Sequence, residues 1–140
     1  MEILILKGLP ASGKTTWAKE KLKEGGWKRV NKDDLRAMLD NGEWSGKNEK
    51  FIVKMEDHLI YQALVNGYNV IVDDTNLNSK HLVRITELAK KFSDTFDREV
   101  EVSTTGFYPT IEECIERDKL RTGRHQVGKA VIRRMANEQS

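Results

Sequence analysis

Two patterns of hydrophobic positions alternate along the chain. The first consists of short runs rich in apolar and β-branched residues, bounded by glycine or polar residues, which is typical of strands. We expect strands at 2–7, 27–31, 69–74 and 98–108. The second is a helical repeat, clearest where apolar residues occupy positions 51, 52, 55, 59, 60, 63 and 64. It predicts helices at 14–24, 47–67, 78–92, 110–121 and 129–138.

Capping residues add one short helix and fix two of the helix starts. Asp33 or Asp34 is expected to be the N-cap of a helix that ends near Leu39. Asn78 or Ser79 is expected to cap the helix that follows the third predicted strand. The segment 40–46, between the helix that ends near Leu39 and the helix predicted at 47–67, has the composition of a loop.

Strands that alternate with helices predict an α/β fold. The connections would be right-handed crossovers, giving a central parallel sheet of about four strands with helices on both faces. The continuous apolar runs at 2–7 and 69–74 suit strands buried on both faces of such a sheet. Since 140 residues accommodate one core of this kind, we expect a single domain spanning 1–140.

The octet GLPASGKT, Gly8–Thr15, lies between the first predicted strand and the first predicted helix. It satisfies G-x-x-x-x-G-K-[ST], the phosphate-binding P-loop pattern, in the context that the pattern requires. Backbone N–H groups of such a loop point at the phosphates, and the helix N-terminus adds partial positive charge. The alternative, a glycine-rich turn that matches by chance, does not explain this context. We predict that ATP contacts Gly8, Pro10, Ala11, Ser12, Gly13, Lys14, Thr15 and Thr16.

A pair of acids follows the third predicted strand. Asp73 and Asp74 end the segment VIVDD, where a P-loop enzyme places an acid near its metal ion. The alternative is an acid that only caps the next loop. Because neighbouring strand residues point to opposite faces, the sequence does not decide which of the two faces the site.

The heptad VNKDDLR, Val30–Arg36, has two interpretations. Asn31–Asp34 matches the N-K-x-D string with which GTP-binding proteins read guanine, but that string occurs late in such chains, far beyond the P-loop. Here it directly follows the second predicted strand, whose carboxyl end should meet the P-loop in one crevice. Asp33 and Arg36, three apart on a helix, would then orient an acceptor hydroxyl. The alternative is that Asp33 only caps the helix and forms an ion pair with Arg36.

Charge and cysteine content indicate a local binding region and a cellular compartment. The net charge is +2, but seven Lys or Arg and one acid lie between Arg117 and Arg134, which indicates a local binding region. Cys114 is the only cysteine, so no intrachain disulfide can form, and a reducing compartment fits. No apolar run approaches the roughly 20 residues that cross a bilayer, and we expect no signal peptide and a cytoplasmic location, the host cytoplasm if the source is a phage.

Four segments together resemble the kinase module of the bacteriophage polynucleotide 5′-hydroxyl kinase family. They are GLPASGKTTW (8–17), VNKDDLR (30–36), VIVDDTNLN (70–78) and the spaced arginines of 116–135, in family order across nearly the whole chain. The first is common to P-loop kinases, whereas the second and third are more discriminating. The resemblance implies transfer of the ATP γ-phosphate to the 5′-OH end of DNA or RNA, with Mg²⁺.

The resemblance also implies roles for residues on the acceptor side. Asp33 matches the general base, and Arg36 matches the arginine that grips the phosphate of the acceptor nucleotide. Asp74, rather than Asp73, matches the essential acid, with Thr75 beside the acceptor phosphate.

On the ATP side, the resemblance matches Lys14 to the phosphate lysine and Thr15 to the metal-binding hydroxyl. It matches Arg117 and Arg121 to arginines of a helical lid, about 110–128, that clamp the ATP phosphates. Arg117 and Arg121 are also i and i+4 on a helix that enters a glycine-containing loop, which suits a mobile lid. The loop is one residue longer than the family pattern, so Arg124 is a rival for either role.

Two other functions are weighed against the 5′-kinase. A P-loop kinase of a small-molecule hydroxyl, such as a nucleoside, sugar or antibiotic, would share the ATP half of the site. A nucleotide-dependent switch would have no acceptor and no use for the pair Asp33 and Arg36. Of the remaining polar and aromatic residues, His58 and His81 are expected to be packing or surface residues. Trp44 is expected to pack against the protein, with base stacking as the alternative.

Overall fold

Four parallel strands form the centre of the fold. The computed structural model describes residues 1–138, except for the side chains of Arg124 and Glu138. The strands are β1 (Glu2–Gly8), β2 (Trp27–Val30), β3 (Asn69–Val72) and β4 (Glu101–Phe107), arranged in the order β2-β3-β1-β4. All three pairings are parallel, with Ile3 opposite Val70 and Glu2 opposite Glu101. The α/β fold with a four-stranded parallel sheet is therefore confirmed.

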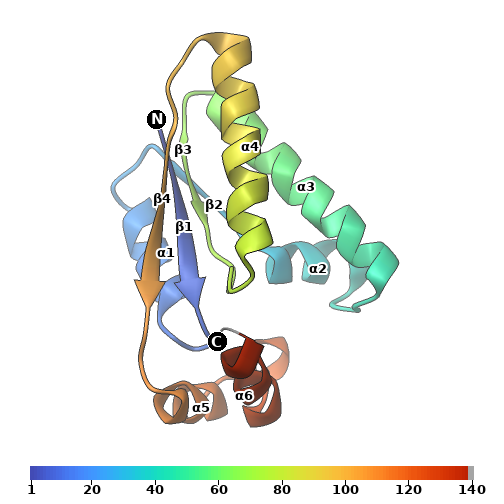
Figure 1. The fold of residues 1–140 in the computed structure, drawn as a ribbon. Coiled ribbons are helices and arrows are strands. Elements are labelled where there is room, and N and C mark those ends of the chain that lie inside the picture. Colours follow the sequence, from blue (N-terminus) through green and yellow to red (C-terminus); the bar gives the residue numbers. More distant parts are fainter. Residues whose placement is uncertain (139–140) are drawn as a thin grey trace.

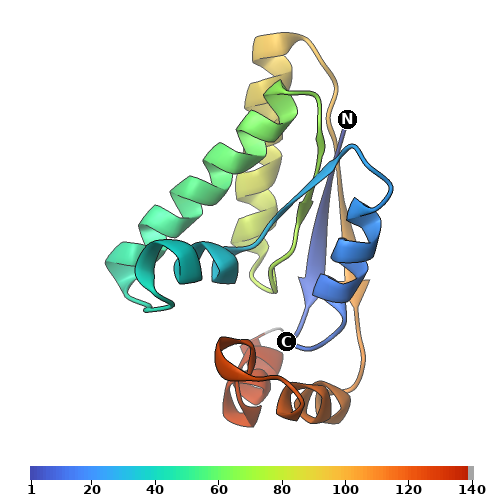
Figure 2. The same cartoon turned by 180° about the vertical axis from the view of Figure 1, so that it is seen from behind.

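Six α-helices and one 3₁₀ turn connect and follow the strands in the described part of the chain. They are α1 (Lys14–Leu22), α2 (Lys32–Asp40), α3 (Gly46–Val65), α4 (Ser79–Phe96), α5 (Ile111–Lys119), η1 (Gly123–His125) and α6 (Lys129–Glu138). In Figure 1, α3 and α4 lie on one side of the sheet, and Figure 2 shows α1 on the other. The prediction of helices on both faces is thus confirmed.

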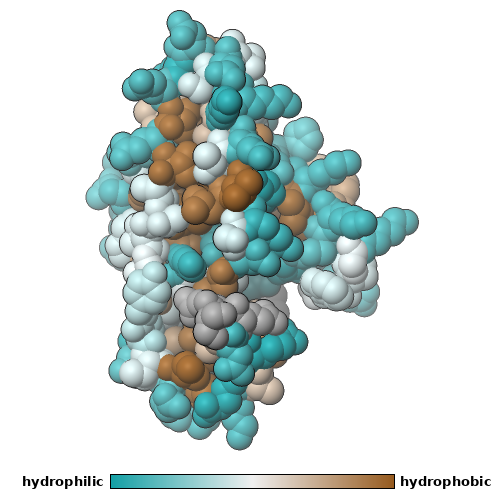
Figure 3. All heavy atoms as spheres, in the orientation of Figure 1, coloured by the Kyte–Doolittle hydropathy of each residue, from teal (hydrophilic) through white to brown (hydrophobic). Residues whose placement is uncertain are grey.

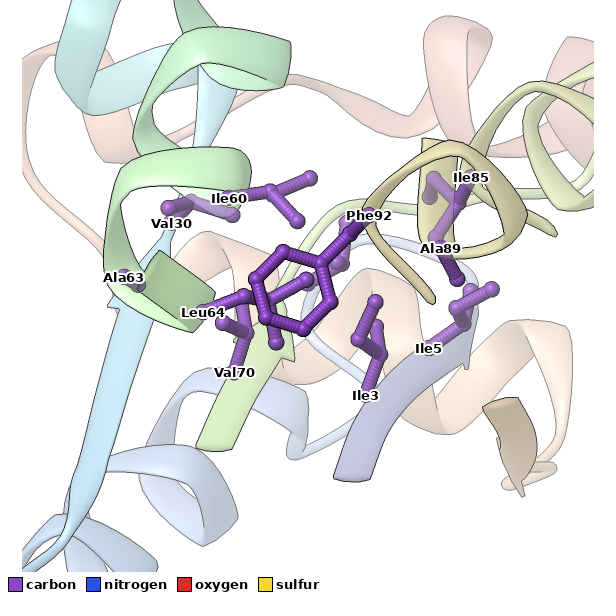
Figure 4. Close-up of a cluster of buried hydrophobic side chains, with 11 residues drawn as sticks. Ile3, Ile5, Val30, Ile60, Ala63, Leu64, Val70, Ile85, Ala89 and Phe92 are labelled. Carbon is purple, nitrogen blue, oxygen red and sulfur yellow. The ribbon is translucent and has the colours of Figure 1, made fainter. Parts of the chain in front are cut away.

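The larger core cluster lies between the sheet and α3 and α4. Figure 4 shows Phe92 of α4 among Ile3, Ile5 and Val70 of the strands, with Leu64 of α3 beside it. These side chains are at most 1% exposed, so each contributes the full free energy of apolar burial, about 1.5–3 kcal/mol for an aliphatic or phenyl group. On the opposite face, Ala18 of α1 packs with Leu6 and Ile71.

A third cluster holds the last two helices against the carboxyl ends of the strands. Cys114 and Ile115 of α5 pack with Ile132 of α6 and with Leu9, which directly follows β1. Figures 1 and 2 both show α5 and α6 gathered at the end of the sheet to which the strand arrows point. The predicted lid region of 110–128 therefore includes α5 and η1, and α6 packs against it.

The helix caps show where the sequence-based expectation was wrong. The N-cap of α2 is Asn31, whose Oδ1 accepts a hydrogen bond of 2.8 Å from the backbone N–H of Asp34, and not Asp33 or Asp34. The two acids instead lie in the first turn, where they favour the positive end of the helix. Asn78 caps α4, as expected.

The last strand also begins later than predicted, at Glu101 instead of 98. It pairs only with β1, and its residue Glu101 lies opposite Glu2, the first residue of that strand. Among residues 1–138, the residues upstream of Glu101 therefore have no neighbouring strand with which to form ladder hydrogen bonds. Within the described residues, no helix combines the length and the hydropathy that crossing a bilayer requires.

Candidate active site

A cavity of about 210 Å³ lies at the carboxyl ends of the strands. It is lined by four segments that are distant in sequence: the P-loop, the start of α2, the residues after β3, and the lid. Of the predicted site residues, it brings together Pro10, Ala11, Ser12, Lys14, Thr15, Asp33, Arg36, Asp74, Thr75 and Arg121. The strand-end crevice of an open parallel sheet is where such folds bind ligands.

Two glycines shape the P-loop. Gly13, the residue before α1, has φ of 103°, which side chains rarely allow. A Cβ at Gly8 would lie 2.7 Å from the carbonyl oxygen of Phe107 in β4. The backbone of the loop therefore passes too close to β4 for any residue larger than glycine.

Lys14 is folded back onto its own loop. Its ammonium group donates to the carbonyl oxygens of Gly8 at 2.8 Å and Leu9 at 2.7 Å, and to Ser12 Oγ at 3.2 Å. The pKa of Lys14 is lowered to about 8, chiefly by burial; Asp73 opposes this shift, and the nearby Arg121 adds to it. A bound phosphate would favour the charged form, because it supplies the anionic partner that the loop carbonyls replace only in part.

Asp73 contacts the P-loop directly. Its Oδ2 accepts a hydrogen bond of 2.9 Å from the Thr15 hydroxyl and one of 2.7 Å from Arg29 Nε. Its Oδ1 is buried and has no partner among the described residues. A hydroxyl and a carboxylate oxygen are hard donors of the kind that Mg²⁺ selects, usually one or two from the protein with the remainder from water and phosphate. Thr15 and Asp73 therefore fit a magnesium site.

Asp74, which also follows β3, contacts the start of α2 instead of the P-loop. Its Oδ1 accepts a hydrogen bond of 2.8 Å from the backbone N–H of Lys32, and its Oδ2 is buried without a partner in the described part of the chain. Glu56 of α3 is 0% exposed, and its Oε2 also lacks a donor among those residues. A proton on one of these two carboxyl groups would form a hydrogen bond between them and give both oxygens a partner.

Burial, together with the charge of Asp74 and a hydrogen bond with it, raises the pKa of Glu56 to about 9. Arg84 opposes the shift by donating to Glu56 Oε1 at 3.0 Å, but it is shared with Asp57. Glu56 is therefore neutral near pH 7 and holds the Asp74 carboxylate in place.

We expect this neutral acid to make stability fall as pH rises. The folded-state pKa of Glu56 lies above its ordinary value of 4.5, so its contribution is complete below that value and is lost as pH approaches about 9. The free energy of unfolding should decline by up to about 1.4 kcal/mol more per pH unit in the wild type than in Glu56→Gln. Urea unfolding of both proteins at pH 6.5, 7.25 and 8 measures this difference. Equal slopes would contradict a neutral Glu56.

Asp33 and Arg36 form the ion pair that their spacing predicts. Arg36 Nη1 donates to Asp33 Oδ1 at 2.7 Å. The Asp33 side chain is 68% exposed, so this pair adds little to stability. Glu49 of α3 holds the other edge of the guanidinium, accepting from Nε at 2.9 Å and from Nη2 at 2.7 Å. Glu49 thus fixes the direction of Arg36, and the hydrogen bond from Arg36 lowers the pKa of Glu49.

Three residues that sequence reasoning did not single out as functional support these positions. Arg29 bridges Asp73 and Asp34, with distances of 2.7 and 2.8 Å. Asn76 is buried and donates from Nδ2 to the Leu6 carbonyl at 2.6 Å, which ties the end of β3 to β1. Asn31 donates to the Asp73 carbonyl. The segment DTN at 74–76 supplies a signal for Asn76, whereas no local pattern marks Arg29.

Of the two lid arginines, Arg117 lies in α5, whereas Arg121 follows the end of this helix at Lys119. The expectation that both lie on one helix was therefore wrong. Arg117 Nη1 lies 3.5 Å from the Ala11 carbonyl oxygen, and Arg121 Nη1 donates to the His125 carbonyl at 3.1 Å. Asp118, which is buried, accepts from the backbone N–H groups of Val127 and Gly128 at 2.9 and 2.8 Å. Asp118 therefore fixes the connection between α5 and α6. The side chain of Arg124, the rival lid arginine, lies outside the described residues.

The two lid arginines do not occupy the same space. Arg121 lines the 210 Å³ cavity and also a second, more open hollow of about 600 Å³. Arg117 lines only the second among the described hollows, where it joins Ala11, Gly13, Thr16, Trp17, Glu20 and Phe107. Gly13 and Thr16, predicted as ATP contacts, thus line this outer hollow, whereas Gly8 lines neither hollow and its carbonyl oxygen accepts from Lys14.

Comparison with known families decides the identity of this arrangement. Residues 3–139 match the family AAA_33, which is described as an AAA domain. The chain belongs to this family. The AAA_33 match covers the P-loop, the strand ends and both lid helices, and together with the four-stranded parallel sheet it makes the chain a P-loop kinase with a nucleotide-binding loop.

Individual relatives of this AAA_33 chain include enzymes that act on nucleic acid. It is 34% identical over 92 residues to the L-seryl-tRNA(Sec) kinase of Methanococcus maripaludis, covering 64% of this chain and 36% of that protein. It is 30% identical to a putative bifunctional polynucleotide kinase/RNA ligase of Autographa californica nuclear polyhedrosis virus, covering 95% of this chain and 20% of the viral protein.

Among solved structures, a chain of the Pnkp1/Rnl/Hen1 RNA repair complex superimposes with a TM-score of 0.81 and 30% identity. The match covers 99% of this chain and 43% of the other. The resemblance to the polynucleotide kinases that the sequence motifs indicated is thereby confirmed. The AAA_33 chain spans less than half the length of each of these relatives.

Proposed function

We propose that the protein is an ATP-dependent polynucleotide 5′-hydroxyl kinase that requires Mg²⁺. One observation carries the proposal: Lys14 and Thr15 of the P-loop line the same cavity as Asp33 and Arg36 of α2. A switch protein needs only the first pair. The second pair gives the cavity an acid for a hydroxyl and a cation for a phosphate, facing the triphosphate site.

On the donor side, the ATP phosphates would lie along the P-loop with Lys14 turned outward to meet them. Thr15 and the free Oδ1 of Asp73 would hold Mg²⁺, which neutralises charge on the β- and γ-phosphate oxygens when bound. Arg121 would add a guanidinium from the lid, and Arg117 would contact the nucleotide from the outer hollow. Water is thereby displaced from the transferred group.

On the acceptor side, the 5′-OH would lie against the exposed carboxylate of Asp33. As the bond between its oxygen and the γ-phosphorus forms, the bond from that phosphorus to the β-bridging oxygen breaks and ADP leaves, while the hydroxyl proton passes to Asp33. Glu49 occupies the Nε and Nη2 edge of Arg36, so Nη1, which now contacts Asp33, is the group available to an acceptor phosphate. Thr75 and Asp74 complete this wall of the cavity.

Two details complete the proposal. A cytoplasmic location rests on the one cysteine, Cys114, which is a buried free thiol.

A second candidate function is a kinase whose acceptor hydroxyl is carried by a small molecule or by an aminoacyl-tRNA, and the 34% identity to a seryl-tRNA kinase favours the latter.

Incubation with ATP labelled at the γ-phosphate separates these functions. The acceptors would be a 5′-OH oligonucleotide, a seryl-tRNA, and a mixture of nucleosides and sugars, each in a separate reaction. The proposal predicts label on the oligonucleotide. Label on the seryl-tRNA or on a small compound alone would replace the proposal by the second candidate, and release of free phosphate without any labelled acceptor would indicate a switch or regulatory ATPase.

A further inference from the structure

A groove of about 580 Å³ adjoins the acceptor side of the active-site cavity. It is bounded by the α2–α3 connection, the first half of α3 and the first two turns of α4. Lys32, the first residue of α2, lines both the groove and the cavity that contains Asp33. The two spaces therefore meet at the beginning of α2.

The groove carries unbalanced positive charge. Lys32, Lys50 and Lys80 line it, and none of them forms an ion pair within the part of the chain that the structure describes. The other two charged residues on its walls are already paired, Glu49 with Arg36 and Arg84 with two acids of α3. Lys32 is buried and acts electrostatically on Glu49 and Glu56, but Lys50 and Lys80 are exposed. Two exposed lysines outside any ion pair of the described residues, on one concave surface, suit a ligand with several negative charges.

An aromatic side chain stands at the rim of this basic surface. Trp44, in the α2–α3 connection, is 68% exposed, so the expectation that it packs against the protein was wrong. In Figure 3, the surface in the part of the molecule where α3 lies in Figure 1 is mainly hydrophilic. On the groove wall, His81 Nδ1 is buried and has no hydrogen-bond partner among the described residues.

We propose that the groove receives the part of a single-stranded acceptor that follows its 5′-terminal nucleotide, with a base stacked on Trp44 and phosphates on Lys50 and Lys80. The inference rests on the proposed function and extends it. Lysines beside an exposed aromatic ring are the arrangement with which proteins bind single strands without reading their sequence. A strand whose 5′-OH lies at Asp33 passes Lys32 on its way out of the cavity, which favours nucleic acid over an acidic protein as the occupant.

Acceptors of different lengths test this assignment. The variants are Trp44→Ala and the double substitution Lys50→Ala/Lys80→Ala, whose side chains are exposed and contribute little to the fold. The matched control is Lys90→Ala/Lys91→Ala, which removes two exposed lysines from the other end of α4. For a 12-nucleotide acceptor, we expect kcat/KM to fall roughly ten- to hundredfold in the groove variants. For a nucleoside 3′-monophosphate it should be unchanged, and the control should match the wild type with both.

Binding of a fluorescent 12-mer that already carries a 5′-phosphate separates the groove from catalysis. Anisotropy titrations should show weaker binding by the groove variants only, and the double variant should lower the slope of log K against log salt by roughly 1.4. If the groove variants and the wild type give equal values, the groove assignment is overturned even if oligonucleotides are phosphorylated. If the wild type phosphorylates no oligonucleotide, the proposed function fails, and the groove assignment then stands or falls with these titrations. Tight binding of an acidic peptide in place of the 12-mer would overturn it in favour of a protein partner.

Discussion

Replacing Asp33 by alanine is expected to lower kcat by roughly 10²–10⁴-fold, the range for loss of a general acid or base. The Kd of ATP should stay within a few fold. Asp33 lines the cavity that the P-loop also lines, and Arg36 is the partner seen for its carboxylate. Asn31, not Asp33, caps α2, so the substitution removes the acid without removing the cap.

The measurement combines kcat at saturating concentrations of both substrates with calorimetric titration of ATP. Asp33→Asn is the matched variant, because it keeps the size of the side chain and removes the negative charge. Both variants should show the same loss of kcat, and thermal unfolding should be close to that of the wild type. A tenfold or larger rise in the Kd of ATP with a nearly normal kcat would assign Asp33 to nucleotide binding and remove its role toward the acceptor.

The second large effect is expected at Arg121. A lid guanidinium that contacts the transferred phosphoryl group contributes roughly 10³-fold or more to the rate in enzymes of this chemistry. Arg121 lines the cavity that holds Lys14, and it is close enough to lower the pKa of that lysine, after the larger effect of burial and against that of Asp73. Arg121→Ala should therefore reduce kcat by roughly 10³-fold, and Arg121→Lys should restore little of it because a lysine lacks the planar fork.

Arg117, which lies in α5 shortly before the connection that contains Arg121, provides the comparison. Its guanidinium is near the Ala11 carbonyl and lines only the outer of the two hollows at the P-loop, in the described residues. Arg117→Ala should raise the KM for ATP with a smaller change in kcat. Steady-state kinetics with each variant distinguishes the two assignments. Equal effects of both substitutions on kcat and KM would show that the two arginines act as one clamp.

The fold and part of the cavity lining could be predicted from the sequence because both depend on local patterns. The strand and helix periods placed nearly every element, and the P-loop octet is contiguous. Asp33 and Arg36 could be paired because their spacing of three is fixed by the helix. In each of these cases the residues that form the pattern lie close together in the sequence.

The supporting contacts could not be predicted because they join distant segments. Glu49, which holds Arg36, comes from another helix, and Glu56 reaches Asp74 from α3. The choice between Asp73 and Asp74 was framed by strand alternation, yet β3 ends at Val72, so that rule does not apply to either residue. Both acids line the cavity, with Asp73 at Thr15 and Asp74 at the start of α2.

The most direct test uses two oligonucleotides of identical sequence, one ending in a 5′-OH and the other in a 5′-deoxy terminus that lacks only this hydroxyl. Each is incubated with the protein, Mg²⁺ and γ-labelled ATP, and the labelled position is identified by 5′-specific phosphatase treatment. We predict label on the 5′ oxygen of the first oligonucleotide and none on the second. Equal labelling of both, or label on neither while another hydroxyl compound is phosphorylated, would contradict the account.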